Sequence, residues 1–189
     1  NEDIALMRTI PGMVVLNPSD DIEAKAAVEA AYEHVGPVYL RFGRLAVPVI
    51  NDRPDYKFEI GKAITLREGK DVTIIATGLT VAESLAAAEK LEADGISAEV
   101  INMHTIKPLD EEAVIAAAAK TGKIVTVEEH SVIGGLGSAV CDVVAEKAPA
   151  KVKKIGINDT YGESGPAVEL IKKYGLDADS IYAAVKAFV

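Results

Sequence analysis

Regular alternation of strand-like and helix-like segments after residue 70 constrains the fold of this chain more than any other feature of its sequence. Four apolar runs have the length and flanking residues of buried strands, and they cover residues 71–77, 97–102, 123–128 and 152–157. Helix-like runs separate these strands and follow the last one, over residues 80–95, 110–121, 134–147, 165–173 and 178–188. Because strands joined through such helices form right-handed crossovers, the pattern predicts a parallel sheet with helices on both faces.

One further strand is expected before this alternation begins. Residues 58–66 place apolar side chains on one face of an extended segment, and only the turn-like residues 68–70 separate them from the strand at 71–77. A connection this short forces an antiparallel pair, since a parallel crossover takes a dozen or more residues. We therefore predict an α/β fold with a mixed five-stranded sheet, four strands parallel and one edge strand antiparallel.

A short strand-helix-strand unit lies at the start of the chain. Residues 13–16 and 38–40 are apolar strands, and the helix between them is capped by Asp20, with Glu23 three residues on. A unit of about 45 residues is too small to bury both faces of two parallel strands. We therefore expect this unit to be the tail of a second α/β domain.

The domain boundaries follow from these patterns. The proline-containing stretch that ends at residue 57 has neither helical nor alternating period, which is typical of a linker. We assign residues 1–47 to the tail of the first domain, 48–57 to the linker and 58–189 to the sheet domain.

Charge and composition exclude several classes of function. The chain has 20 basic and 29 acidic side chains, a net charge of −9, and no cluster of lysine and arginine, so a nucleic-acid partner is not expected. No apolar run approaches the ~20 residues that cross a membrane. A single cysteine, Cys141, permits no internal disulfide, which favours a reducing compartment. We expect a cytoplasmic protein, and the start at Asn1 without a methionine suggests a piece of something longer.

Two arginines near a strand end are candidates for anion binding. Arg41 and Arg44 follow the strand at 38–40, and Gly43 between them lets the backbone turn. Guanidinium groups bind phosphate or carboxylate groups through paired hydrogen bonds. The alternative is an ion pair with an acidic residue across a subunit boundary.

The remaining candidates favour structural roles when taken alone. His104 follows the strand at 97–102, where it can bind an anion or a buried carbonyl group. Glu128, Glu129 and His130 resemble a metal cluster, but neighbouring residues on a strand point to opposite faces, so no metal site is expected.

The glycines and the cysteine of residues 134–141 give no stronger indication of a functional site. The glycine-rich turn at 134–138 offers backbone amides at a helix start, which can hold an anion. It matches no phosphate-binding motif, so close helix packing is the preferred explanation. Cys141 lies within the helix predicted at 134–147 among apolar neighbours, and we expect it to be inert.

Several segments, taken in order, identify a family. They are the runs EDIALMRTIPGM at 2–13, NPSD at 17–20, GPVYLRFGR at 36–44, KPLD at 107–110, TVEEHS at 126–131 and GGLG at 134–137. Together they resemble the C-terminal section of transketolase-like, thiamine-diphosphate-dependent enzymes, and the resemblance covers essentially the whole chain. It implies that residues 1–47 are the remnant of a pyrimidine-binding domain and residues 58–189 are a transketolase C-terminal domain.

The resemblance also implies a reaction and a set of substrate-binding residues. Transketolases transfer a two-carbon ketol unit between sugar phosphates on thiamine diphosphate, and the cofactor supplies the difficult chemistry. In this family the arginine that ends the segment after Gly-Pro binds the substrate phosphate, which assigns that role to Arg44, with Arg41 as the second candidate. His104 occupies the position at which deoxyxylulose-phosphate synthases carry a phosphate-binding arginine.

Residues for the cofactor are absent from this chain. The family's Mg²⁺ and diphosphate signature does not occur in it, and the glutamate and histidines of the pyrimidine domain would precede Asn1. We therefore expect thiamine diphosphate and Mg²⁺ in the complete enzyme but neither on this fragment, and no catalytic residue is assigned here. The implied partners are a second copy in a homodimer, an N-terminal transketolase section or subunit, and a sugar phosphate.

Two alternatives remain open. A deoxyxylulose-phosphate synthase and the beta subunit of a 2-oxoacid dehydrogenase share this domain order. A non-catalytic module that serves dimerisation or regulation belongs to a different class.

Overall fold

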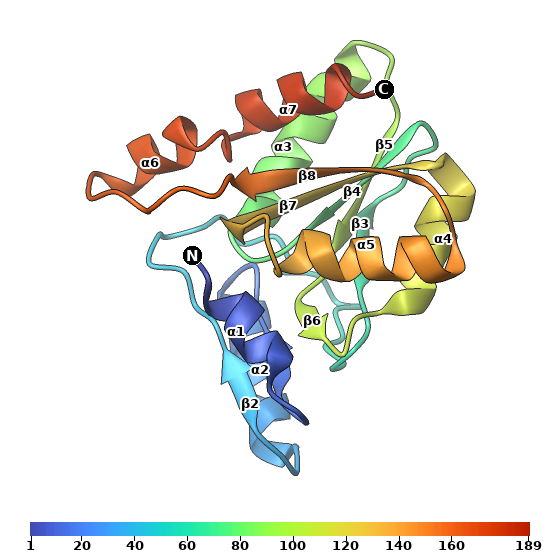
Figure 1. Ribbon diagram of the computed structural model, residues 1–189. Helices are drawn as coiled ribbons and strands as arrows, with labels where there is room; N and C mark the ends of the chain where they lie inside the picture. Colours follow the sequence, from blue (N-terminus) through green and yellow to red (C-terminus); the bar gives the residue numbers. More distant parts are fainter.

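Two sheets organise the structure, a computed structural model that describes residues 1–189 (Figure 1). The larger sheet has the order β3-β5-β4-β7-β8 and the smaller one the order β2-β1-β6. The strands of the larger sheet are β3 (Ile64–Arg67), β4 (Val72–Ala76), β5 (Ala98–Asn102), β7 (Lys123–Ser131) and β8 (Lys151–Ile157). Its helices are α3 (Thr80–Ala93), α4 (Glu111–Thr121), α5 (Leu136–Lys147), α6 (Ala167–Lys173) and α7 (Ala178–Lys186).

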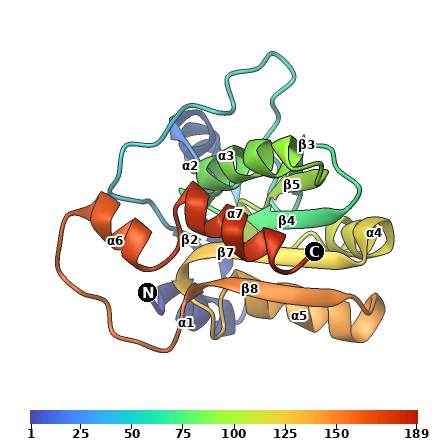
Figure 2. The same cartoon turned by 90° about the horizontal axis from the view of Figure 1, so that it is seen from above.

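The larger sheet confirms the predicted fold class. β5, β4, β7 and β8 are parallel, and β3 is the antiparallel edge. The alternating side chains of β4 explain why helices are needed on both sides. Ile74 belongs to the core beneath α3 and α7, whereas Ile75 belongs to the core beneath α4 and α5 (Figure 2). Strands buried on both faces are typical of parallel sheets.

The pairing of the edge strand differs from the prediction. β3 pairs with β5 and not with β4, although only residues 68–71 connect β3 to β4. The turn crosses the start of β5, where the amides of Lys70 and Asp71 both donate to the carbonyl of Ser97, at 3.1 and 2.9 Å. Gly69 makes this crossing possible, because a Cβ at that position would lie 2.1 Å from the amide nitrogen of Glu99.

The helix ends agree with the sequence at some positions and differ at others. Asp110 precedes α4 and caps it by accepting a hydrogen bond from the amide of Ala113, as expected of an aspartate before a helix. Thr80 and Glu83 have the spacing of a capping box. They form none, because the Glu83 carboxylate instead accepts from the amide of Ala178 at the start of α7, at 2.8 Å. Ser164 caps no helix, since α6 begins only after Pro166.

The smaller sheet belongs to an N-terminal lobe, which consists of residues 1–40 and β6. Its elements are α1 (Asp3–Thr9), β1 (Val14–Leu16), α2 (Asp21–Glu33), β2 (Val38–Leu40) and β6 (Thr105–Lys107). β1 and β2 are parallel, which confirms the strand-helix-strand unit. β6 was not predicted. It follows β5 in the chain yet pairs antiparallel with β1, so a segment from the second half of the chain completes this lobe.

The N-terminal lobe covers the carboxyl ends of the larger sheet's strands. The amide of Asn17, after β1, donates to the carbonyl of His104, after β5, at 2.8 Å, and the Asn17 carbonyl accepts from the amide of Gly78, after β4, at 3.2 Å. Ligands of open parallel sheets usually bind at this edge. Here the N-terminal lobe covers this edge. Residues at these strand ends therefore lie in the interface between the lobe and the larger sheet, which we call the packed joint. No helix has the length and apolar character needed to span a lipid bilayer.

Candidate functional site

An open groove separates the loop after β2 from the segment that enters α6. Residues 39–45 line one side of it and Glu163, Ser164 and Gly165 line the other, with a volume of about 1010 Å³. We call it the Arg44 groove, because Arg44 is exposed on its wall. The two sides are more than a hundred residues apart in sequence, and no spacing in the chain could have linked them.

Arg44 is the arginine that has no partner within the protein. The chain has five arginines, and the other four each lie within 4.0 Å of a carboxylate, namely Arg8, Arg41, Arg53 and Arg67. An unpaired guanidinium offers five N–H donors in a planar arrangement that matches phosphate, carboxylate or sulfonate oxygens. The groove therefore presents one free, permanently charged anion-binding group to solvent.

Arg41 lines the same groove but its guanidinium is already paired. Its Nε donates to Asp3 Oδ2 at 2.9 Å, its Nη1 to Glu129 Oε2 at 3.2 Å, and its Nη2 to the Glu129 carbonyl at 3.0 Å. Asp3 also accepts from the Tyr39 hydroxyl at 2.9 Å. Although burial opposes it, Arg41 and Tyr39 lower the pKa of Asp3. The two arginines therefore do not form a joint binding fork.

The structure gives Gly43 a different setting from the one expected. Gly43 does not have a positive φ, and a Cβ there would meet only Leu79 Cδ2 at 3.8 Å, an ordinary contact. The turn between Arg41 and Arg44 therefore does not require a glycine.

His104 lies in the packed joint and not in the Arg44 groove. Its ring is fully buried and stacks on Phe58, with 4.3 Å between ring centres and 28° between the planes. Nδ1 lies 3.0 Å from Thr105 Oγ1, Nε2 has no partner, and burial lowers the pKa of the ring. The structure thus does not bring His104 to the other two predicted phosphate-binding residues.

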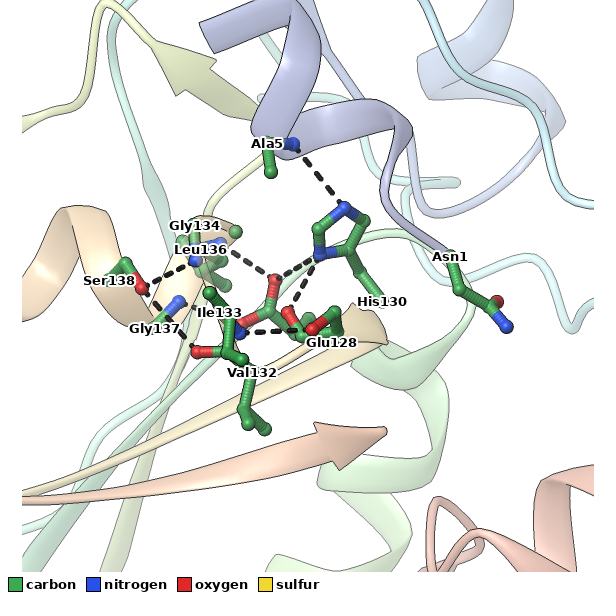
Figure 3. Close-up of polar contacts among 12 residues, drawn as sticks. Asn1, Ala5, Glu128, His130, Val132, Ile133, Gly134, Leu136, Gly137 and Ser138 are labelled. Atoms are coloured by element: carbon green, nitrogen blue, oxygen red, sulfur yellow. Dashed lines mark hydrogen bonds and ion pairs between the residues drawn. The ribbon is translucent and has the colours of Figure 1, made fainter. Parts of the chain in front are cut away.

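Glu128 and His130 point to one side of β7 and Glu129 to the other, as the alternation of strand side chains predicts. Glu128 is fully buried, and its carboxylate accepts from the amides of Leu136 at 2.7 Å and Gly137 at 2.8 Å (Figure 3). The amides at the start of α5 therefore hold an anion that belongs to the protein itself. Burial raises the pKa of Glu128 to about 7, against the lowering effect of these two hydrogen bonds.

Gly135 explains how the carboxylate reaches those amides. A Cβ on Gly135 would lie 2.0 Å from Glu128 Oε2 and 2.7 Å from His130 Nδ1. The glycines of this turn thus serve close packing, as expected from the sequence. The same turn provides the amides that donate to Glu128.

His130 joins α1 to the larger sheet. Nδ1 lies 2.7 Å from the carbonyl of Ser131, and Nε2 accepts from the amide of Ala5 at 3.3 Å (Figure 3). An Nε2 that accepts and an Nδ1 that donates define the neutral tautomer, and burial lowers the pKa of the ring accordingly. Arg8 adds a second contact, donating to the carbonyl of Gly135 at 3.1 Å.

A second buried carboxylate, missed by the sequence analysis, ties α2 to the larger sheet. Glu23 accepts from the amide and hydroxyl of Ser19, both at 2.7 Å, from Asn102 Nδ2 at 2.9 Å, and from the Tyr56 hydroxyl at 3.1 Å. The only signal for it was its place three residues after Asp20, which is typical of a helix cap. With its oxygens satisfied by protein donors, Glu23 is structural.

Metal ligands do not gather anywhere in the chain. No group of three histidine, cysteine, aspartate or glutamate side chains has a geometry that could hold a metal ion. Cys141 lies in α5, partly buried, and burial raises the pKa of its thiol.

The comparisons with known proteins agree with this architecture. Residues 61–181 match the family model described as transketolase, C-terminal domain, and residues 1–49 match the one described as transketolase, pyrimidine binding domain. The chain belongs to the transketolase family.

Curated relatives within the transketolase family are mostly longer than this chain. The 6-deoxy-6-sulfo-D-fructose transketolase subunit of Clostridium sp. (strain MSTE9) is 49% identical over 97% of this chain and 56% of its own length. The putative transketolase C-terminal section of Methanocaldococcus jannaschii is 50% identical over 95% of this chain and 57% of its own length. The chain thus spans little more than half of these relatives. 1-Deoxy-D-xylulose-5-phosphate synthase 1 of Geobacter sulfurreducens is 41% identical over 99% of this chain and 30% of its own length.

A solved transketolase structure has nearly the same fold. A split-gene transketolase, described as an inactive β4 tetramer, superimposes with a TM-score of 0.94 at 50% identity, over 99% of this chain and 61% of that chain. The two family models also locate the Arg44 groove. Its Arg44 side lies in the residues matched by the pyrimidine-binding model and its Glu163 side in those matched by the C-terminal model.

Proposed function

We propose that this chain is the C-terminal portion of a transketolase, which transfers a two-carbon ketol unit between phosphorylated sugars with thiamine diphosphate. In this proposal Arg44 binds the anionic tail of the sugar. The observation that supports it most directly is the unpaired, exposed guanidinium of Arg44 in an open groove, while the other four arginines have carboxylate partners.

The role proposed for Arg44 is binding and orientation. A guanidinium that donates two parallel hydrogen bonds fixes both the position and the direction of a phosphate group. Holding the tail of the sugar in this way keeps its carbonyl end at a defined distance from the reacting centre, which lowers the entropic part of the barrier. No proton transfer is assigned to residues of this chain.

The proposal places the cofactor and its metal ion on another part of the enzyme. It is supported by the observation that no group of three or more histidine, cysteine, aspartate or glutamate side chains in this chain could hold a metal ion. We propose that an N-terminal section or subunit holds both, and that a competent enzyme contains two copies of each part. The inactivity described for the related β4 tetramer is consistent with a need for that second part.

Substitution of Arg44 tests the proposal. In the complete enzyme, Arg44→Ala should raise the KM for ribose 5-phosphate or xylulose 5-phosphate, because a lost charged hydrogen bond costs roughly 1.5–3 kcal/mol, or about 10- to 150-fold. The measurement is steady-state kinetics with each sugar phosphate and with the corresponding unphosphorylated sugar.

A matched control removes an arginine elsewhere. Arg67→Ala deletes the same charge at β3, where Arg67 pairs with Glu92, and should leave the KM unchanged. If Arg44→Ala and Arg67→Ala have the same kinetics with sugar phosphates, Arg44 does not bind the substrate tail.

The identity of the substrate is a separate question, and the relatives suggest which assays to run. One relative is named for a sulfonated sugar and another for 1-deoxy-D-xylulose 5-phosphate synthesis. Assays should therefore compare sugar phosphates, a sugar sulfonate, and pyruvate as the two-carbon donor. Turnover with pyruvate and an aldose phosphate, but not with ketose donors, would replace transketolase activity with synthase activity.

A further inference from the structure

The loop that carries Arg44 covers residues 42–49 and directly follows Arg41. Arg41 donates its backbone amide to the carbonyl of Leu16 at 2.9 Å, which is the last ladder bond beyond β2. None of residues 42–49 donates a backbone hydrogen bond, and the next amide that does so is that of Ile50, to Asp20 Oδ2 at 2.8 Å. Leu45, next to Arg44, packs against the core beneath α3 and α7. Among polar contacts, the position of Arg44 therefore depends on those that hold Arg41.

Three charged hydrogen bonds hold Arg41. Asp3, at the start of α1, takes one, and the side chain and carbonyl of Glu129, on β7, take the other two. The Arg41 side chain is only 15% exposed, so these bonds lie largely outside solvent and are correspondingly strong. Two of the three acceptors therefore belong to Glu129, a residue of the larger sheet, and of these two only the carboxylate is changed by a substitution.

We propose that Glu129 is a positioning residue for substrate binding. Through Arg41 it fixes the start of residues 42–49 and so sets the direction of the Arg44 guanidinium toward the anionic tail of the sugar. The C-terminal domain would then contribute to substrate affinity without any of its residues touching the phosphate. This inference rests on the role proposed for Arg44.

Charge alone predicts that Glu129 weakens anion binding, whereas a positioning role predicts that it strengthens anion binding. Glu129 lines the Arg44 groove, and a carboxylate there repels an anionic ligand. Removing it should therefore improve anion binding if only electrostatics mattered. If Glu129 instead positions Arg41, removing it should weaken anion binding. The sign of the change in KM separates the two explanations.

The test uses Glu129→Gln in the complete enzyme. We expect its KM for xylulose 5-phosphate to rise roughly 5- to 20-fold, which is less than the ~100-fold that a 1 Å displacement can cost. The ratio of kcat/KM for phosphorylated over unphosphorylated xylulose should fall by a similar factor. A purely structural defect would lower both values together and leave that ratio unchanged, which would overturn the proposal.

Glu92→Gln is the matched control. Glu92 lies on α3 outside the groove and pairs with Arg67, so its substitution deletes the same charge but leaves Arg41 in place. This variant should not raise the KM. Equal increases in Glu92→Gln and Glu129→Gln would contradict a role through Arg41.

A double variant separates failure of this inference from failure of the proposed function. Once Arg44 is replaced by alanine, adding Glu129→Gln should change the KM for the phosphorylated sugar less than twofold, since its effect passes through Arg44. If Arg44→Ala raises the KM but Glu129→Gln does not, the positioning role is wrong and the proposed function stands. If Arg44→Ala has no effect, the proposed function fails first.

Discussion

At the scale of single residues, Glu128 places a side-chain carboxylate on the backbone amides that start α5. Its carboxylate has both oxygens on the amides that start α5, and no part of the side chain is exposed. Amides at a helix start favour the charged carboxylate, while burial favours the neutral acid. Burial is the larger effect, and it raises the pKa of Glu128 to about 7.

The pH dependence of stability should reveal this titration. The folded pKa of about 7 exceeds the usual value of 4.5, so the native state keeps a proton that the unfolded chain releases. Stability from this group is therefore complete below pH 4.5 and falls as the pH rises toward 7, by about 3 kcal/mol in all. In Glu128→Gln, which has no titrating group at this position, that fall should be absent when unfolding free energies are measured by urea denaturation from pH 4.5 to 8.

A second variant on the same strand provides the comparison. Val127→Ala removes buried apolar contacts but no ionisable group, so its difference from the unchanged protein should be the same at every pH. A difference between the unchanged protein and Glu128→Gln that is equally flat would contradict the raised pKa.

For single residues, the sequence predicted the direction in which strand side chains point better than it predicted which residues surround them. The alternation of strand side chains correctly separates Glu129 from Glu128 and His130. It could not show that Glu129 meets Arg41, because that contact joins residues 88 positions apart. Nor could it show that His104 is enclosed, since its surroundings come from Phe58 and the N-terminal lobe.

At the scale of elements, the amphipathic pattern of α7 determines its packing. Ile181 and Val185 lie one turn apart and are fully buried against the core under α3, while Lys186 pairs with Asp94 at the surface. Residues at positions i and i+4 share one face of a helix, so the pattern predicts which side of α7 is covered.

Truncation of one buried side chain tests this packing. Ile181→Ala should lower the free energy of unfolding by about 2–5 kcal/mol, because it removes buried apolar surface and leaves a cavity. Val168→Ala, on α6 and 71% exposed, should change it by less than about 0.5 kcal/mol. Both are measured by urea denaturation followed by circular dichroism, and similar losses in the two variants would refute the assignment of α7 to the core.

Element boundaries were more predictable than element neighbours. The strands at 71–77, 97–102, 123–128 and 152–157 all appear within a few residues of the predicted bounds. The neighbour of β3 did not follow from the short turn, because a connection of four residues, 68–71, fixes strand direction but not adjacency. β6 was missed because only Ile106 of its three residues is apolar, whereas the equally short β1 and β2 are continuous apolar runs.

At the scale of the whole molecule, the absence of a group of metal-ligating side chains leads to a prediction about cofactor binding. The chain on its own should bind thiamine diphosphate negligibly in the presence of Mg²⁺, because it has no group of three or more histidine, cysteine, aspartate or glutamate side chains that could hold a metal ion. Isothermal titration calorimetry of the 189-residue chain is the measurement, and micromolar binding would contradict the expectation. Addition of an N-terminal section should restore binding if the proposed division of the site is correct.

β6 comes from the second half of the chain but pairs with β1 in the N-terminal lobe. The fold of the lobe therefore depends on both halves of the chain. Proteolytic scission anywhere in residues 48–57 would leave β6 hydrogen-bonded to β1, with Asn17 still bound to His104. The two fragments would then copurify as a noncovalent complex. Recombination of gene segments within residues 48–57 would likewise join the lobe to a β6 from a different parent, so a chimeric protein needs the residue at position 106 exchanged together with Ile4 and Val15, against which it packs.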